Sequence, residues 1–199
     1  MAKIDATAIQ YNDNHLVDFD RSGKITASLV AAILGIDPYT SRQKAWRKIM
    51  GLEKYREPWI HQRRGMENEC HAIADFEVAT GQLLHHGCFV SHPTISWIGA
   101  SPDGLARDET HGHCIPVEVK CPVILHTSVP PHYFAQVQTQ IECLDAPYGW
   151  FFSWTEYESS LPMKVERDRA WWSETLLVLE GFYTEFVLGN CQPPRRKKS

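Results

Sequence analysis

The 199-residue chain carries 20 Lys and Arg against 24 Asp and Glu, for a formal net charge of −4, and 43% of its residues are hydrophobic. These proportions are ordinary for a folded globular protein and exclude disorder over most of the length. The negative net charge excludes a protein that coats nucleic acid through bulk positive charge, but it leaves room for an anionic ligand held in one basic groove.

The length predicts a single domain over residues 1–192, followed by a basic tail over residues 193–199. Pro193 and Pro194 cannot continue a helix, so the tail is expected to be a flexible, solvated end. No run approaches the roughly 20 apolar residues that span a bilayer, and the start of the chain lacks the features of a secretion signal. The six Cys lack paired metal-ligand spacing, which favours reduced thiols in a cytoplasmic protein.

Three helices are predicted in the first part of the chain. Thr26–Leu34 has a capping residue at its start and ends before Gly35. Ser41–Met50 likewise ends before Gly51. Arg64–Thr80 places apolar residues at near-helical spacing and predicts a longer helix.

The middle of the chain predicts strands. Leu83–Val90, Ile95–Ala100 and Ile115–Cys121 are short β-branched or aromatic runs separated by Pro and Gly. Asp108–Gly112 is expected to form a hairpin turn between two strands.

The last third returns to a mixed pattern. His132–Glu142 predicts a helix, Tyr148–Trp154 and Leu161–Val165 predict strands, and Asp168–Leu188 predicts a long closing helix with Asp168 and Gly189 at its ends. The expected fold class is therefore α/β (α+β), with a central mixed β-sheet flanked by helices.

One constellation of charged residues points to chemistry. In the predicted strand, Glu118 and Lys120 alternate with Val117 and Val119, so the charges should face a cleft while the valines face the interior. Asp103 lies in a Pro-Asp-Gly turn, and a hairpin should bring it beside Glu118. Two carboxylates then converge on one lysine.

Such a set of oxygen ligands suits a hard cation such as Mg²⁺, with the carbonyl of Val119 as a third ligand. Lys120 would orient or deprotonate an attacking water, or stabilise charge on phosphorus, and these roles remain open. A Glu-x-Lys strand alone is usually an exposed ion pair worth under about 1 kcal/mol. The added Asp103 turn and the apolar strand favour a metal site.

Four ordered motifs carry a family resemblance over about Arg21 to Trp154. They are Arg21-Ser-Gly-Lys-Ile-Thr-Ala-Ser28, Gly65-x-x-x-Glu69-x-x-Ala72, Ser101-Pro-Asp-Gly104 with Glu118-Val-Lys120, and Tyr133-x-x-Gln136-Val-Gln138. The third resembles the PD-(D/E)xK nuclease signature. Together they resemble the phage lambda-type exonucleases, or YqaJ-like viral recombinase nucleases, which implies a restriction-endonuclease-like core.

The resemblance implies roles for individual residues. It implies five catalytic residues, namely Lys120, Glu118, Asp103, Glu69 and Gln136. It implies that the metal ligands are Asp103, Glu118, the Val119 carbonyl and, through water, Glu69. The implied cofactor is Mg²⁺, with Mn²⁺ as a substitute and two ions in each active site.

Exonucleases of this kind are also implied to recognise a 5′-phosphate. The candidates are Arg21, whose planar fork can grip phosphate oxygens, together with Ser28, Ser101 and Gln136. For each serine alone, capping or turn formation is the ordinary explanation.

The resemblance implies a 5′ to 3′ exonuclease that degrades one strand of linear double-stranded DNA and leaves a 3′ overhang for strand annealing. It further implies a ring-shaped homotrimer, a phage single-strand annealing protein as partner, and action in the bacterial host cytoplasm if the chain is phage-encoded. An endonuclease of the same superfamily and a noncatalytic DNA-binding domain of the same fold are the alternatives.

Further basic and aromatic residues are candidates for a DNA path. The basic ones are Arg42, Lys44, Arg47, Lys48, Arg63 and Arg64. A solvated face is the usual meaning of such residues. Residues Lys54 to Gln62, with Tyr55 and Trp59, are a candidate loop for separating the DNA strands by stacking on a base.

Overall fold

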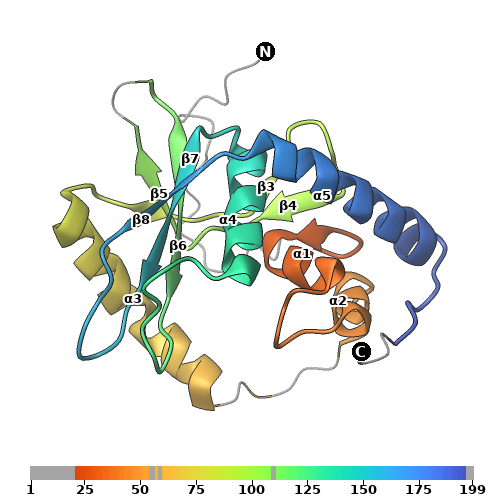
Figure 1. The fold of residues 1–199 in the computed structure, drawn as a ribbon, viewed down its shortest axis with the longest axis horizontal. Helices are drawn as coiled ribbons and strands as arrows, with labels where there is room; N and C mark the ends of the chain where they lie inside the picture. The colour runs from red at the N-terminus through yellow and green to blue at the C-terminus, as the bar shows by residue number, and fades with distance from the viewer. Residues whose placement is uncertain (1–20, 54–56, 58–59, 109–110, 196–199) are drawn as a thin grey trace.

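Two mixed β-sheets lie at the centre of the computed structural model, which describes residues 21–53, 57, 60–108 and 111–195 (Figure 1). The larger sheet consists, in spatial order, of β2 (His85–His86), β5 (Gly104–Arg107), β6 (Cys114–Lys120), β7 (Tyr148–Ser153) and β8 (Met163–Glu166). The smaller consists of β1 (Ile25–Thr26), β4 (Ile98–Ala100) and β3 (Val90–Ser91). β6 runs parallel to β7, and β1 runs parallel to β4, while the other pairs are antiparallel. The predicted central mixed sheet is confirmed.

Helices flank these sheets, as predicted. They are α1 (Ala27–Leu34), α2 (Arg42–Ile49), α3 (Ile60–Thr80), α4 (Pro131–Leu144) and α5 (Arg169–Phe182), which continues as the π-helical segment η2 (Tyr183–Leu188). Within the described residues, no helix has the length and apolar character that crossing a membrane requires.

Two helices cover opposite faces of the larger sheet, and the aromatic residues of β7 show which is which. Phe152 packs edge to face against Phe76 of α3, with 5.5 Å between ring centroids. Its neighbour Phe151 faces the other way and stacks on Tyr133 of α4, also at 5.5 Å. Because successive side chains of a strand alternate faces, α3 and α4 sandwich the sheet between them.

The position of β6 in this sandwich decides where its charges lie. Residues paired across neighbouring strands share a face, and Glu118 pairs with Phe151 while Val119 pairs with Phe152. Glu118 therefore lies under α4 and is fully buried, whereas Lys120, at the strand end, is 24% exposed. The expectation that both charges meet a cleft is right for Lys120 and wrong for Glu118, because α4 covers that part of the strand.

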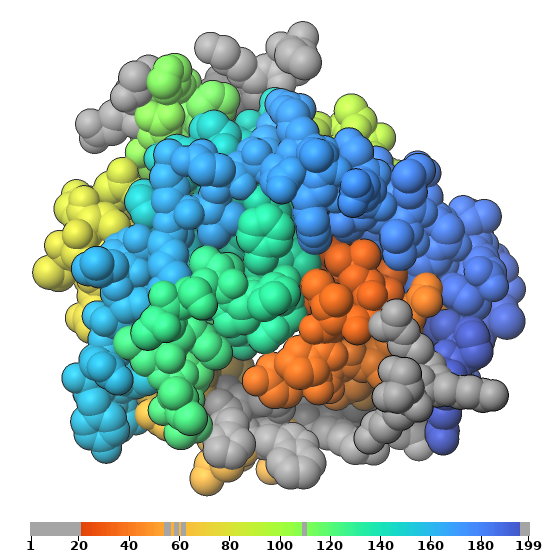
Figure 2. All heavy atoms as spheres, in the orientation of Figure 1, coloured from red at the N-terminus to blue at the C-terminus, as the bar shows by residue number. Residues whose placement is uncertain are grey.

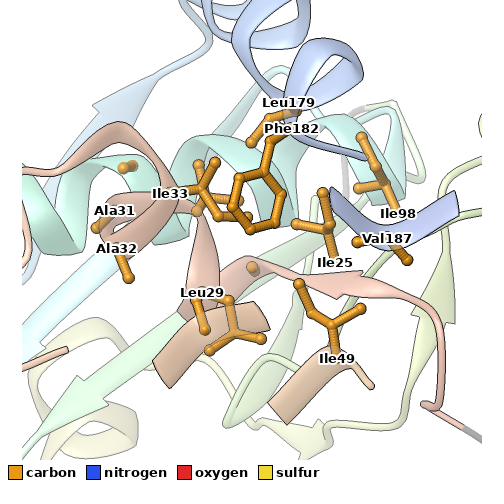
Figure 3. Close-up of a cluster of buried hydrophobic side chains, with 14 of the residues drawn as sticks. Ile25, Leu29, Ala31, Ala32, Ile33, Ile49, Ile98, Leu179, Phe182 and Val187 are labelled. Atoms are coloured by element: carbon orange, nitrogen blue, oxygen red, sulfur yellow. The ribbon is translucent and has the colours of Figure 1, made fainter. Parts of the chain in front are cut away.

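A second core joins the smaller sheet to the surrounding helices (Figure 3). Ile25 of β1 and Ile98 of β4 contribute from the sheet, Ile33 from α1, Ile49 from α2 and Phe182 from α5, and all five are buried. This core fixes α1 and α2 beside the smaller sheet, and Asp103 lies shortly after β4 of that sheet.

The helix boundaries predicted from capping residues agree best with the structure. Thr26 precedes α1, and Gly35 ends it with a left-handed φ of 79°. The Ser41 side chain accepts a hydrogen bond from the Lys44 amide and so begins α2. Asp168 caps α5 in the same way, through the Trp171 amide. These local signals were readable from the sequence.

Short strands were predicted less well. The expected strand Leu83–Val90 is instead divided between β2 and β3, which belong to different sheets, and the strand predicted from Ile95 begins only at Ile98. β1 and β5 were not predicted, β8 begins at Met163 rather than Leu161, and α3 begins at Ile60 rather than Arg64. Strands of two to four residues owe their existence to pairing partners far along the chain, which local patterns do not reveal.

The end of the chain is attached to α2. The Trp46 indole donates to the carbonyl of Phe186 at 2.8 Å, and the Gln43 amide donates to the carbonyl of Pro193 at 3.0 Å. The first residue of the predicted tail therefore has a defined contact, while residues 196–199 lie outside the described residues.

Replacing Arg167 with Ala is expected to lower the free energy of unfolding by about 3–5 kcal/mol, because it leaves a buried carboxylate without its partner. Arg167 is 12% exposed and grips both oxygens of Glu142, one of them at 2.7 Å, while also contacting Asp145 at 2.6 Å. The exposed pair between Lys164 and Glu166 provides the control, and Lys164→Ala should cost less than about 1 kcal/mol. Urea denaturation followed by tryptophan fluorescence measures both, and equal losses would contradict this expectation.

Candidate active site

A cleft of about 1130 Å³ opens between α2, α3, the segment after β6 and the start of α4. Figure 2 shows the surface hollowed between the green segment that follows β6 and the orange segment that contains α2. Its lining residues include the acids Glu69 and Asp103 and the bases Lys44, Lys48, Arg64 and Lys120. The cleft thus combines a small acidic centre with cationic walls.

Asp103 is fixed against β6 through two hydrogen bonds. Its amide donates to the carbonyl of Val117 at 3.1 Å, and its Oδ2 accepts from the amide of Val119 at 2.7 Å. The chain can pass close by because residue 87 is Gly, since a Cβ there would lie 1.7 Å from the carbonyl oxygen of Pro102. The hairpin predicted to bring Asp103 to the central strand is present, although its first strand is β5.

Glu118 is held by three hydrogen bonds beneath α4. Its Oε1 accepts from the Lys120 ammonium and from Gln136 at 2.6 Å, and its Oε2 accepts from Gln140 at 2.5 Å. Burial, together with the nearby charge of Asp103, raises the pKa of Glu118 to about 7 despite the opposing effect of Lys120. The neighbouring carboxylates of Glu118 and Asp103 therefore favour the binding of a further cation beside them.

Lys120 connects the two acids. Its Nζ contacts Glu118 and lies 3.9 Å from Oδ2 of Asp103, and it also lies 5.4 Å from the ring centroid of Tyr133. Burial opposes the charged form, but the two carboxylates outweigh it and raise the pKa of Lys120 above its usual value. The lysine is therefore a charged ammonium at the floor of the cleft.

Glu69 joins this centre from α3. It is half-buried and lines the cleft with Asp103. Burial and the charge of Asp103 raise the pKa of Glu69, while Lys120 opposes the shift. The structure thus brings together residues from four segments, namely the predicted Glu69 of α3, Asp103 before β5, Glu118 and Lys120 of β6, and Gln136 of α4.

The donor atoms of this region suit a magnesium-type cation. As the side chains stand, no group of three or more His, Cys, Asp or Glu among the described residues is gathered closely enough to be a metal centre. Mg²⁺, however, needs only one or two carboxylates and keeps several waters, and it takes oxygen ligands. Asp103, Glu69 and Val119 line the cleft, and the two carboxylates and the Val119 carbonyl are oxygen donors. The residues present therefore fit the cation.

Residues 19–158 match the family model of the YqaJ-like viral recombinase domain. The chain belongs to the YqaJ-like viral recombinase family.

Solved structures agree with this family assignment. An alkaline exonuclease from Laribacter hongkongensis is 29% identical, with a TM-score of 0.70 over 85% of this chain and 90% of that chain. The same exonuclease in complex with dAMP gives 28% identity, the same coverage and a TM-score of 0.71. A phage-related exonuclease from Haemophilus somnus 129PT is 14% identical, with a TM-score of 0.58 over 83% of this chain and 96% of that chain, and supports the fold alone. No curated protein matches significantly. Family membership and the Laribacter likeness together support a nuclease.

In this YqaJ-like chain, the two serines predicted to bind a 5′-phosphate lie just beyond the ends of two neighbouring strands. β1 and β4 run parallel, with Thr26 paired to Gly99; Ser28 lies in the first turn of α1, directly after β1, and Ser101 directly follows β4. Ser28 is exposed at the start of α1, and its hydroxyl lies 3.3 Å from that of Thr26. Both serines thus follow the carboxyl ends of neighbouring parallel strands.

Arg21 precedes β1 and contacts Phe89, the residue before β3. It is exposed, and its guanidinium lies 5.6 Å from the ring centroid of Phe89. The ring of Phe89 in turn packs over Gly99 of β4, where a Cβ would lie 2.2 Å from it. Arg21, Ser28 and Ser101 do not line the cleft described above. Ser101 lies two residues before Asp103, directly after β4, whereas Arg21 lies before the start of β1.

The structure separates the basic candidates on α2 and α3. Lys44, Lys48 and Arg64 line the cleft. Arg42 instead stacks over Phe182, at 5.4 Å, and the others pair with acids, Arg47 with Glu53 and Arg63 with Glu57. The proposed strand-separating residues Tyr55 and Trp59 lie outside the described residues.

Gln140 lies at the site but was not predicted from the sequence. It lies one helical turn after Gln136 and contacts the same carboxylate. The signal was available, because residues four apart share one face of a helix. Several non-acidic residues of the cleft were also missed, namely Tyr39, Thr40, Val123, Ile124 and His126.

Proposed function

We propose that this chain is a metal-dependent 5′ to 3′ exonuclease that degrades one strand of linear double-stranded DNA and leaves a 3′ single-stranded overhang for strand annealing. The observation that carries the proposal is the convergence of Asp103, Glu118 and Lys120 beside a cleft with cationic walls, in a chain of the YqaJ-like family. An acidic centre beside basic walls suits a phosphodiester substrate that is attacked with the help of a cation.

The cofactor in this proposal is Mg²⁺, with Mn²⁺ as a substitute and two ions in the site. Asp103, Glu118 and the Val119 carbonyl would hold them, with Glu69 acting through water. When bound, such a metal lowers the pKa of a coordinated water and offsets charge on the phosphoryl oxygens. The oxygen-only donor set and the raised pKa of Glu118 and Glu69 support this assignment.

Lys120 supplies a positive charge that belongs to the protein itself. Lys120 already contacts one carboxylate and approaches the other, so its ammonium can orient the attacking water or stabilise charge that develops on phosphorus. Lys44 and Lys48 of α2 and Arg64 of α3 would attract the phosphates of the strand being degraded.

Recognition of the 5′-phosphate is assigned to Arg21, Ser28, Ser101 and Gln136. The location of both serines just beyond the carboxyl ends of neighbouring parallel strands supports their joint action, and the guanidinium of Arg21 supplies a planar fork for phosphate oxygens. Gln136 links this function to the catalytic centre through its hydrogen bond to Glu118.

A comparison of two linear duplexes that differ only in their 5′-phosphate tests this proposal. Wild type should degrade the phosphorylated end roughly tenfold faster or more, because a bidentate charged contact to phosphate contributes about 1.5–3 kcal/mol. Arg21→Ala should remove the preference, while Arg107→Ala, at an exposed arginine on β5, should retain it. Equal cutting of closed circles and linear DNA would instead identify an endonuclease.

The assembly in this proposal is a homotrimeric ring that encloses DNA, with a phage single-strand annealing protein as partner in the bacterial host cytoplasm. Membership of a viral recombinase family supports this recombination role. The mass of the protein in solution, measured by light scattering, distinguishes a trimer from a monomer of 22.8 kDa.

A further inference from the structure

Gln140 has a buried side chain that none of the roles above explains. It lies in α4 and is 0% exposed. Its Nε2 donates to Oε2 of Glu118, while its Oε1 has no hydrogen-bond partner among the described residues. Burying an amide whose oxygen lacks a hydrogen-bond partner opposes folding. The hydrogen bond that Nε2 of Gln140 donates to Glu118 is therefore expected to serve a function.

The two oxygens of Glu118 are held in different ways. Oε1 accepts from Lys120, which is 24% exposed and lines the cleft, and from Gln136, which is half-buried. Lys120 thus borders the open space of the cleft, and Gln136 is only partly covered. Oε2 accepts from Gln140 alone among the described side chains, and Gln140 is enclosed. Oε1 is therefore the exchangeable oxygen and Oε2 the anchored one.

The helix that carries Gln140 is a firm support. Gln136 and Gln140 are four residues apart and so share one face of α4. Around them, Val137 and Ile141 are fully buried in the core of the larger sheet. Side chains on such a packed helix hold their positions better than side chains on loops.

We propose that Gln140 is a positioning residue that anchors Oε2 of Glu118 and thereby keeps Oε1 directed toward Asp103, where a divalent cation would be held. The Lys120 ammonium, which contacts Oε1 and lies 3.9 Å from Asp103, marks the cationic position between the two acids. The inference rests on the proposed metal-dependent function. It extends that function to a fully buried residue that does not line the cleft.

The test is Mn²⁺ binding to the DNA-free protein, measured by titration calorimetry. Gln140→Met keeps the volume of the side chain and removes its hydrogen-bond donor. The dissociation constant for Mn²⁺ should rise roughly 10- to 100-fold, as is typical when the partner of a metal ligand is lost. Thermal unfolding of the same samples reports whether the variant is folded.

Gln138→Met is the matched control. Gln138 is also fully buried in α4, but its amide donates to the carbonyl of Glu166 at 2.6 Å and accepts from the amide of Asp168 at 3.0 Å, away from Glu118. This variant should unfold at a lower temperature and bind Mn²⁺ like wild type. Equal losses of Mn²⁺ affinity in both variants would overturn the inference, because they would reflect general loosening of the helix.

Gln140→Asn keeps the test decisive if the Met variant fails to fold. Asn retains a buried amide but is one methylene shorter, so it loses the contact with Glu118 and should show a similar loss of Mn²⁺ affinity. Wild-type binding that neither Gln140 variant weakens would overturn the inference and leave the proposed function intact. A wild-type protein that binds no Mn²⁺ would overturn both.

Discussion

Replacing Lys120 with Ala is expected to reduce the rate of nucleotide release from linear duplex DNA by roughly 10³-fold, the magnitude typical of losing a charged catalytic group. The ammonium is the cation that joins Glu118 to Asp103, so its removal leaves two neighbouring carboxylates without their common partner. Single-turnover digestion of a labelled duplex at saturating Mg²⁺ measures the effect on the reaction itself.

Lys164→Ala provides the matched control for this loss. Lys164 lies on β8, and its side chain is 45% exposed in a surface ion pair. Its removal should leave the digestion rate within about twofold of wild type, because such pairs contribute little. A folded Lys120→Ala protein that digests DNA at the wild-type rate would contradict the assigned role of Lys120.

A large effect on stability is expected at Phe152, in the core of the larger sheet. Phe152→Ala should lower the free energy of unfolding by about 3–5 kcal/mol, because it removes a large buried ring and leaves a cavity that the sheet cannot close. Phe152 is fully buried in β7, pairs with Val119 and packs against Phe76 of α3. Guanidinium denaturation followed by circular dichroism measures the change.

Tyr157→Ala serves as the aromatic control, since Tyr157 is 91% exposed. Its replacement should change the free energy of unfolding by no more than about 0.5 kcal/mol. Comparable losses from the two variants would mean that α3 does not depend on Phe152 for its contact with the sheet.

The central charged residues could be predicted because the signals were local. A proline-introduced turn placed Asp103 next to a returning strand, and strand alternation put Glu118 and Lys120 on one face. The structure agrees on both points. Alternation specifies a face, however, and does not specify what covers it. The complete burial of Glu118 follows from the docking of α4, which comes from a later part of the chain.

The strands of the smaller sheet could not be predicted from local patterns. β1 and β3 have two residues each, and neither has an alternating pattern long enough to recognise. They form because both pair with β4, which lies more than 70 residues after β1. The relation between Ser28 and Ser101 depends on that pairing, so the sequence identified the two residues without their geometry.

Digestion of a 5′-end-labelled linear duplex by wild-type protein, in Mg²⁺ and in EDTA, tests the central claim most directly. The proposed active centre of Asp103, Glu118 and Lys120 predicts release of labelled mononucleotide in Mg²⁺, beginning at the 5′ end, and no release in EDTA. Absence of any Mg²⁺-dependent release, or equal release in EDTA, would contradict the assignment of a metal-dependent exonuclease.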